Sequence, residues 1–416
     1  MSSDEKLPPR AWLIVALVWG ALCLNYVHRL MITTMRGSIL EAIPMTEAQF
    51  GLLTSVFLVV YAVASPFAGY FADRFNRSHV ITGSVLIWSI VTALTAYATT
   101  YEQLLATRVL MGLGQAACMP ASVALVVDYH RSSTRSLASG LLLSGAMAGG
   151  AMSGLGGWVA DDQGWAFTFK SFGWVGAGYS VVLLLLLRDA PATEMSAERQ
   201  ASPASAVRIG EAFAHLFTNR GYLVMLVYAC VVGVVSWSVA GWMPTFIKEH
   251  FKLTQGAAGL YTTICLNVSG LLGMLVGGAW ADRWSRTQPK ARIFVPVLGL
   301  CLAAPSVLLL AKAPLLAMAL AGLVGYGIGR HFVDANTMPI MCMVVDARYR
   351  ATSWGMFAFC SCVVGAVGIY AGGLLRDAQI DISRVFLFAV ANIVVGAFLI
   401  YSLRRYASAA PKPAAG

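Results

Sequence analysis

Charged side chains are scarce in this sequence. Asp, Glu, Lys and Arg make up 12% of its 416 residues, about half of the roughly 25% that is typical of soluble domains. The mean hydropathy is +0.71, and apolar runs of the length that a helix needs to cross a bilayer, about 20 residues, recur along the chain. These features exclude a soluble domain and predict an all-α membrane protein.

Signatures of catalysis and metal binding are missing as well. The sequence contains no phosphate-binding loop, no catalytic triad pattern and no cluster of metal ligands. Its eight cysteines lie inside apolar runs without zinc-type spacing to histidine, which predicts small buried side chains rather than a metal site or a disulfide framework. We therefore expect neither an enzyme nor a bound metal or cofactor, and an ATP-driven pump is excluded.

Twelve apolar segments are predicted to be transmembrane helices. They are residues 11–33, 48–71, 79–98, 102–127, 136–159, 168–187, 221–243, 256–280, 293–311, 314–343, 351–374 and 383–403. A polar stretch rich in Ala, Ser and Pro, residues 189–220, interrupts them at mid-chain. It predicts a cytoplasmic linker between an N-terminal six-helix bundle (1–188) and a C-terminal six-helix bundle with a short cytoplasmic tail (221–416).

Positive charge is distributed unevenly between the two sides of this topology. Nineteen of the 29 Lys and Arg residues fall in the tails and the loops on the same side as the N-terminus, and seven fall on the opposite side. Because cytoplasmic loops are enriched in Lys and Arg, we expect both termini in the cytoplasm. The net charge of +10 is then a consequence of topology, and a nucleic-acid partner is not expected.

A short motif is repeated in the two predicted halves. Residues 69–77 read Gly-Tyr-Phe-Ala-Asp-Arg-Phe-Asn-Arg, and residues 278–286 read Gly-Ala-Trp-Ala-Asp-Arg-Trp-Ser-Arg. Val-Val-Asp likewise recurs at 126–128 and 344–346. We expect the charged residues of the first repeat to form cytoplasmic networks that hold one conformation and release it in the other. These residues are Asp73, Arg74, Arg77, Asp282, Arg283 and Arg286.

The repeated loops resemble the signature of the major facilitator superfamily, and the resemblance covers the whole chain. Within that superfamily the chain is most similar to the anion:cation symporter family. Residues 25–29 (Asn-Tyr-Val-His-Arg) resemble its Asn-Tyr-x-Asp-Arg, residues 108–116 its Arg-x-x-x-Gly-x-Gly-Glu-Ala, and residues 242–246 its Trp-Leu-Pro-Thr-Tyr. Tyr61 matches the family's binding tyrosine. Spinster-type lipid carriers share the first two elements.

The resemblance implies the major facilitator fold, with two pseudo-symmetric six-helix bundles and transport by alternating access. It implies secondary active or facilitative transport of a small organic anion, a sugar acid or another carboxylate, by a monomer in a bacterial inner membrane. Two alternatives stay open: a spinster-like carrier of an amphiphile such as a lysolipid, and a drug or metabolite exporter. The Gly-Pro pair of drug antiporters is missing from residues 149–154.

Charges within the predicted spans are few and predominantly positive. Asp334 is the only acid that falls deep in a span. Its cationic or titratable counterparts are Arg29, Arg108, Arg330, His28 and His331. Because a charge at the membrane centre costs at least about 2.5–3.5 kcal/mol, each is a candidate functional residue. A guanidinium binds a carboxylate through two parallel hydrogen bonds, so an anionic substrate is expected.

Neutral polar residues complete the candidate site, and some of the charged residues have a possible structural role instead. Hydrogen-bonding groups are predicted at Tyr26, Tyr61, Gln115, Asn267 and Asn336. Arg330 and Asp334 are four residues apart and could form a structural pair instead, and Arg108 could bind helix carbonyls. The glycines of the fifth span are expected to mark close helix contact.

Proton coupling cannot follow the route of the family. His28 and Gln115 stand where relatives have Asp and Glu, and glutamine does not titrate. Either the chain is a facilitator or exchanger with little pH dependence, or coupling has moved to His28 or to Asp334, Arg330 and His331.

Overall fold

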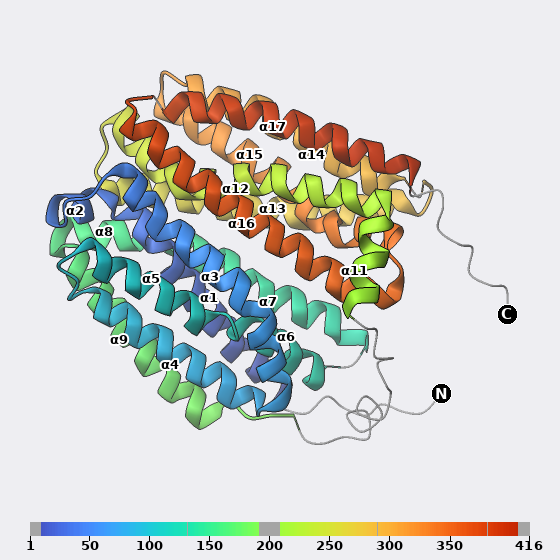
Figure 1. Cartoon of the computed structure of the whole chain (residues 1–416), viewed down its shortest axis with the longest axis horizontal. Helices are drawn as coiled ribbons and strands as arrows, with labels where there is room; N and C mark the ends of the chain where they lie inside the picture. Colours follow the sequence, from blue (N-terminus) through green and yellow to red (C-terminus); the bar gives the residue numbers. More distant parts are fainter. Residues whose placement is uncertain (1–9, 131, 191–208, 289, 381, 407–416) are drawn as a thin grey trace. The chain divides into compact units, whose positions relative to one another are not determined.

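A computed structural model describes residues 10–130, 132–190, 209–288, 290–380 and 382–406 (Figure 1). Within these residues the secondary structure is entirely helical, and 12 helical segments are long and apolar enough to cross a membrane. The predicted all-α fold with twelve transmembrane helices is therefore confirmed.

The chain divides into two compact units. Unit 1 contains Met1–Ala204 together with Lys252–Thr263, and unit 2 contains Ser205–Phe251 together with Ile264–Gly416. The predicted linker falls across this division, and its residues 191–208 lie outside the described residues. The predicted borders of the two bundles stay a prediction.

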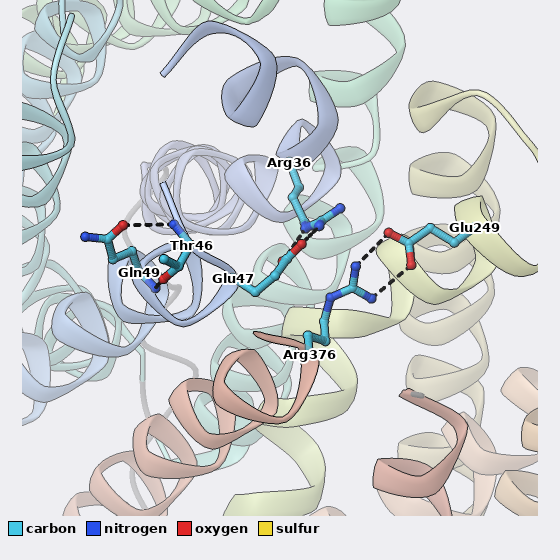
Figure 2. Close-up of polar contacts among 6 residues, drawn as sticks. All are labelled: Arg36, Thr46, Glu47, Gln49, Glu249 and Arg376. Atoms are coloured by element: carbon cyan, nitrogen blue, oxygen red, sulfur yellow. Dashed lines mark hydrogen bonds and ion pairs between the residues drawn. The ribbon is translucent and has the colours of Figure 1, made fainter. Parts of the chain in front are cut away.

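Unit 1 holds the first six spans in nine helices. They are α1 (Ala11–Thr34), α2 (Arg36–Ala42), α3 (Glu47–Arg74), α4 (Arg77–Thr95), α5 (Tyr101–Gln115), α6 (Cys118–Tyr129), α7 (Ser132–Met152), α8 (Leu155–Gln163) and α9 (Trp165–Leu186). The helix α3 begins with a capping box: Gln49 N–H donates to Thr46 Oγ1 at 3.1 Å, and Thr46 N–H donates to Gln49 Oε1 at 2.8 Å (Figure 2).

The predicted spans 102–127 and 136–159 are each found as one membrane-spanning segment, but the regular helical hydrogen bonding of each is interrupted once while the backbone angles stay helical. The fourth span breaks at Ala116 and Ala117, between α5 and α6. Pro120 explains this break, because it has no N–H to bond the carbonyl of Ala116 four residues earlier. The fifth span breaks at Ser153 and Gly154, between α7 and α8.

Glycines allow α7 to approach α1 at backbone distance. A Cβ on Gly145 would lie 2.7 Å from the carbonyl oxygen of Trp19, and one on Gly149 would lie 2.1 Å from that of Cys23. Trp19 Nε1 also donates to Ser144 Oγ at 3.0 Å. The predicted role of the span-five glycines in close helix contact is confirmed.

The first turns of α13 (Gln255–Ser285) belong to unit 1, whereas the rest of that helix belongs to unit 2. Gly256 N–H donates to Asp161 Oδ2 at 2.9 Å, so a carboxylate of α8 caps the start of α13. Thr263 Oγ1 donates to the carbonyl of Ala151 at 2.9 Å. These bonds fix the start of α13 to α7 and α8.

Unit 2 holds the remaining helices. They are α11 (Ile209–Thr218), α12 (Arg220–Phe251), most of α13, α14 (Ala291–Lys312), α15 (Leu316–Val344), η1 (Ala347–Tyr349), α16 (Arg350–Asp377), α17 (Ile382–Ser402) and η2 (Leu403–Arg405). The helices α14 and α15 pack together, and α12 packs on α16 and α17. The helix α11 lies within the predicted linker, and Tyr349 Oη donates to Glu211 Oε1 at 3.3 Å.

Two forked ion pairs lie at helix ends, one in each unit (Figure 2). In unit 1, Arg36 bonds both carboxylate oxygens of Glu47, with Nε to Oε2 at 2.9 Å. In unit 2, Arg376 Nη1 and Nη2 bond Glu249 Oε2 and Oε1 at 2.9 and 2.8 Å. Each pair joins two helices of its own unit, because the fork fits a carboxylate bidentately.

Candidate functional site

Arg29 on α1 lies among three aromatic rings. Its Cζ is 4.3 Å from the ring centroid of Tyr61, 4.8 Å from that of Phe57 and 5.1 Å from that of Tyr26. The residue is only 7% exposed, and among the described residues its Nε and Nη2 have no hydrogen-bond partner. Ring faces attract a cation without using its N–H groups, so the aromatic rings leave these buried donors unused.

Arg108 on α5 is a second buried guanidinium in unit 1. It is 1% exposed, its Cζ lies 5.5 Å from the ring of Phe169 on α9, and its Nε and Nη2 have no partner within the described parts of the chain. The carboxylates that the structure describes in unit 1 lie at helix ends or in connecting segments. No described carboxylate therefore balances these two charges at mid-span.

The break in the fourth span lies directly after Gln115. This side chain is fully buried, and its Nε2 donates to the carbonyl of Asn25 on α1 at 3.3 Å. Its Oε1 has no partner among the described residues. Gln115 thus bonds the backbone of α1, the helix that carries Arg29, and its predicted role as a hydrogen-bonding group for substrate stays a prediction.

His28 has a different environment from its neighbour Arg29. It is 0% exposed, its Nδ1 lies 3.4 Å from Thr92 Oγ1 on α4, and its ring meets the edge of Phe172 on α9 at 6.5 Å. A Cβ on Gly176 would come within 2.9 Å of its Cε1. His28 therefore packs between α1, α4 and α9, and its predicted role in binding or coupling stays a prediction.

In unit 2 the two charged residues predicted deep in a span, Arg330 and Asp334, lie together with His331 in one cluster on α15. Arg330 Nη1 lies 2.6 Å from Asp334 Oδ1, and Arg330 Nε donates to Ser236 Oγ on α12 at 2.8 Å. Arg330 and Asp334 therefore pair across one helical turn, as their spacing allows, and their role in binding or coupling stays a prediction. His331 Nε2 lies 3.9 Å from Asp334 Oδ2.

The tautomer of neutral His331 follows from its second nitrogen. Nδ1 lies 2.8 Å from the carbonyl oxygen of Gly327, which can only accept, so Nδ1 carries the proton. Nε2 then has the free lone pair, on the side of Asp334. A Cβ on Gly270 of α13 would come within 2.5 Å of the ring, so the glycine makes room for this histidine.

The two predicted asparagines are placed differently. Asn336 is 2% exposed, and its Nδ2 donates to the carbonyl of Phe332 at 2.9 Å and lies 3.5 Å from that of Gly277 on α13. Such contacts join α13 and α15. Asn267 is half-buried on α13. Substrate binding by either residue stays a prediction.

The charges of the signature loops pair within each unit. Arg77 pairs with Asp128, which belongs to the first Val-Val-Asp repeat. In unit 2, Asp282 pairs with Arg292 at 2.9 Å, and Asp346 of the second repeat pairs with Arg348 at 3.4 Å. The two copies of the motif thus use different partners.

The remaining members of the two motifs are less defined. Arg283 and Arg286 are exposed, as is Arg74, and the side chain of Asp73 lies outside the described side chains. The predicted gating role of these loops stays a prediction.

Three contributors to the site were missed at the level of sequence. Phe57 completes the ring of aromatics around Arg29, and Ser236 and Tyr228 on α12 approach Arg330. Polar residues eight positions apart in an apolar helix share a face, which was the signal available for the two α12 residues. Phe57 lies one turn before Tyr61 on α3, so the same spacing could have indicated it.

Comparison with known proteins agrees with this architecture. The chain is 26% identical over 405 residues to an MFS-type efflux pump of Mycolicibacterium smegmatis, covering 95% of this chain and 93% of that protein. It is 26% identical over 400 residues to the probable sulfoacetate transporter SauU of Cupriavidus necator, covering 92% of each.

A solved structure shares the fold. It is a bacterial homolog of the human lysosomal transporter Spinster in an inward-facing, unoccupied conformation, with a TM-score of 0.81, 20% identity, and coverage of 99% of this chain and 100% of that one. The family model described as Major Facilitator Superfamily matches residues 17–369. The chain therefore belongs to the major facilitator superfamily and is a multi-pass membrane transporter, not an enzyme.

Proposed function

We propose that the chain transports a small organic anion, a sugar acid or another carboxylate, and that Arg29 binds it. The observation that carries the proposal is the guanidinium of Arg29, which is 7% exposed and has donors without a described partner. Leaving a buried charge unpaired is costly, so a ligand that supplies the counter-charge gains that energy on binding.

The geometry around Arg29 supports a carboxylate in particular. The rings of Tyr26, Phe57 and Tyr61 hold the guanidinium by its faces. A planar carboxylate can then approach its edge and accept two parallel hydrogen bonds. Similarity to a probable sulfoacetate transporter also supports an organic anion, since sulfoacetate carries both a carboxylate and a sulfonate.

Arg108 is proposed to contribute long-range attraction rather than direct contact. It is 1% exposed and lies against Phe169, so it adds positive charge to unit 1 from within the helix packing. We further propose that the transporter is a monomer in a bacterial inner membrane, with both termini in the cytoplasm. The excess of Lys and Arg on the side of the termini supports this orientation.

Uptake into proteoliposomes tests the proposal. A thermal-shift screen of sugar acids, sulfoacetate, phosphate esters, amino acids and lysolipids first selects a transported probe. Arg29→Ala should then raise its KM roughly 10²- to 10⁴-fold, because two hydrogen bonds to a charged group contribute about 1.5–3 kcal/mol each. Arg29→Lys should restore little, because an ammonium cannot make the forked contact.

Arg220→Ala is the matched control, because Arg220 is exposed at the start of α12. It should leave KM unchanged. Wild-type affinity in Arg29→Ala would refute the proposal. Binding of lysolipids alone in the screen would instead favour the spinster-like alternative, and binding of apolar cations would favour a drug exporter.

A further inference from the structure

The helices α12 and α16 run side by side in a fixed register within unit 2. Tyr222 Oη donates to the carbonyl of Ser353 near one end of their contact, and Trp242 Nε1 donates to the carbonyl of Ile369 near the other, each at 3.0 Å. The partners are 131 and 127 positions apart in the sequence. Because this separation hardly changes along the contact, the two helices are parallel, and residues with a similar separation face each other.

Cys230 on α12 and Cys360 on α16 fit this register. Their separation in the sequence lies between those of the two hydrogen-bonded pairs, and their thiols share a hydrogen bond. A Cβ on Gly233, one turn along α12, would lie 2.4 Å from the carbonyl oxygen and 2.9 Å from the Cα of Ser361, the residue after Cys360. The backbones beside the thiols are therefore as close as a disulfide requires, since its Cα atoms lie about 4.4–6.8 Å apart.

A pair of adjacent thiols has a chemistry that a single buried cysteine lacks. When an oxidant forms a sulfenic acid on one sulfur, the second thiol can trap it as a disulfide. Both side chains are half-buried, so a small oxidant can reach them. The spacing of the cysteines in the sequence does not show this pair, because it arises only when α12 packs on α16.

We propose that Cys230 and Cys360 form a redox pair, and that hydrogen peroxide converts their thiols to a disulfide that links α12 to α16. One sulfur attacks a peroxide oxygen, the O–O bond breaks, and a sulfenic acid forms while water leaves. The second sulfur attacks the sulfenic sulfur, so an S–S bond forms and the S–O bond breaks. The released hydroxide takes the remaining thiol proton and leaves as a second water. Together the two sulfur atoms lose two electrons, and the peroxide gains them.

The disulfide would act on unit 2 beyond the two cysteines. Ser236 lies within two turns of Cys230 on α12, where it accepts a hydrogen bond from Arg330 Nε at 2.8 Å. A link to α16 would hold this part of α12 in place, and it would also restrict the unfolded chain. Oxidation should therefore raise the unfolding temperature, and a reducing agent should lower it again.

Peroxide treatment of the purified full-length protein tests the pair. After catalase has removed the peroxide, free thiols are blocked with N-ethylmaleimide in denaturant, and the masses of the intact protein and of its unreduced peptides are measured. The chain has eight cysteines, so the reduced protein should take up eight maleimides and the oxidised protein two fewer. A peptide that contains Cys230 should be linked to one that contains Cys360. Dithiothreitol should separate them and reverse the rise in unfolding temperature.

Serine variants separate this pair from the other cysteines. Cys230→Ser and Cys360→Ser should each lose both the link and the rise in unfolding temperature. Cys362→Ser is the matched control, because Cys362 is also half-buried on α16 but lies on another side of that helix, two positions further on. It should respond to peroxide as the wild type does. The unfolding temperature of each variant under reducing conditions shows whether it is folded.

The mapping in the wild type decides the inference without any variant. A wild-type protein in which peroxide forms no link between Cys230 and Cys360 would overturn it, whether the thiols stay free, are oxidised singly or are linked to other cysteines. An equal rise in unfolding temperature in the wild type and in Cys360→Ser would overturn it as well. These outcomes do not depend on the proposed function, because none of them involves Arg29 or a transported solute.

Discussion

The contact between α1 and α7 makes a sharp prediction for Gly149→Ala. The new Cβ would lie 2.1 Å from the carbonyl oxygen of Cys23 and 2.9 Å from Cβ of Tyr26. Both atoms belong to the backbone or its first side-chain carbon, so they cannot rotate away. The two helices would have to separate by about 1 Å to reach ordinary contact, a strain that costs about 1–3 kcal/mol in packed interiors.

Helix propensity opposes this cost only in part. Alanine is favoured over glycine inside a helix by about 0.5–1 kcal/mol, so Gly149→Ala should be destabilised by about 1–2 kcal/mol overall. Gly140 on the same helix is the matched control, because it is exposed and no atom lies within 4 Å of its Cβ position. Gly140→Ala should be stabilised by about 0.5–1 kcal/mol.

Thermal unfolding in detergent, followed by tryptophan fluorescence at one heating rate, measures the difference. A gap of about 2 kcal/mol corresponds to roughly 4–8 °C for a unit of this size. A shift of α7 would also move Tyr26, whose ring centroid lies 5.1 Å from Cζ of Arg29, so the KM for the transported substrate should rise in Gly149→Ala. If Gly149→Ala unfolds at the same temperature as Gly140→Ala or at a higher one, the inference that α1 and α7 touch at backbone distance is wrong.

The remaining predictions concern carboxylates at helix ends. Asp161→Ala should lower the unfolding temperature, because the N–H of Gly256 loses its cap, at a cost of about 0.5–2 kcal/mol, whereas Asp162→Ala should not. We also propose that Asp73→Asn weakens the cytoplasmic network of the outward-facing state. Cysteines introduced on the cytoplasmic side should then be labelled more readily in Asp73→Asn. If the labelling and the transport rate are both unchanged, Asp73 has no gating role. Arg348 donates hydrogen bonds to Asp346 from its backbone N–H and its side chain, and these bonds lower the pKa of Asp346 below the ordinary value of about 4. The folded protein therefore gains the full stabilisation from these bonds above about pH 4 and loses it as the pH falls through the lowered pKa. The difference in unfolding temperature between the wild type and Asp346→Asn should therefore be constant above about pH 4 and shrink below it, and a difference that grows there would contradict this sign.

The number and type of the helices could be predicted from hydropathy alone, because a bilayer imposes a minimum length on each span. The break after Gln115 was predictable in principle from Pro120, but a proline in an apolar run does not say whether the helix kinks or ends. The helix α11 was missed because polar and small residues around it resemble a linker. Composition does not show what a short amphipathic helix packs against.

The sequence predicted how deep in the membrane each charged residue lies, but it did not always predict its ion-pair partner. Arg330 and Asp334 are four residues apart on one helix, so their contact followed from helical geometry. The partner of Asp282 is Arg292 on the next helix, which no spacing rule selects. The aromatic surroundings of Arg29 required two helices to be placed side by side, and sequence periodicity along one helix carries no information about that.

Among the described residues, the arginines deep in the spans are balanced by a carboxylate in unit 2 but not in unit 1, and this difference should make transport depend on the membrane potential. Arg29 and Arg108 have no described carboxylate beside them, whereas Arg330 is neutralised by Asp334. A transmembrane potential acts with about 2.3 kcal/mol per elementary charge for each 100 mV that the charge crosses. Counting the described residues, an empty carrier therefore presents two unbalanced charges to the field, and a monoanion bound as proposed would reduce them to one. Net uptake, which requires the empty carrier to return, should then depend more steeply on an imposed potassium diffusion potential than exchange between two loaded compartments does.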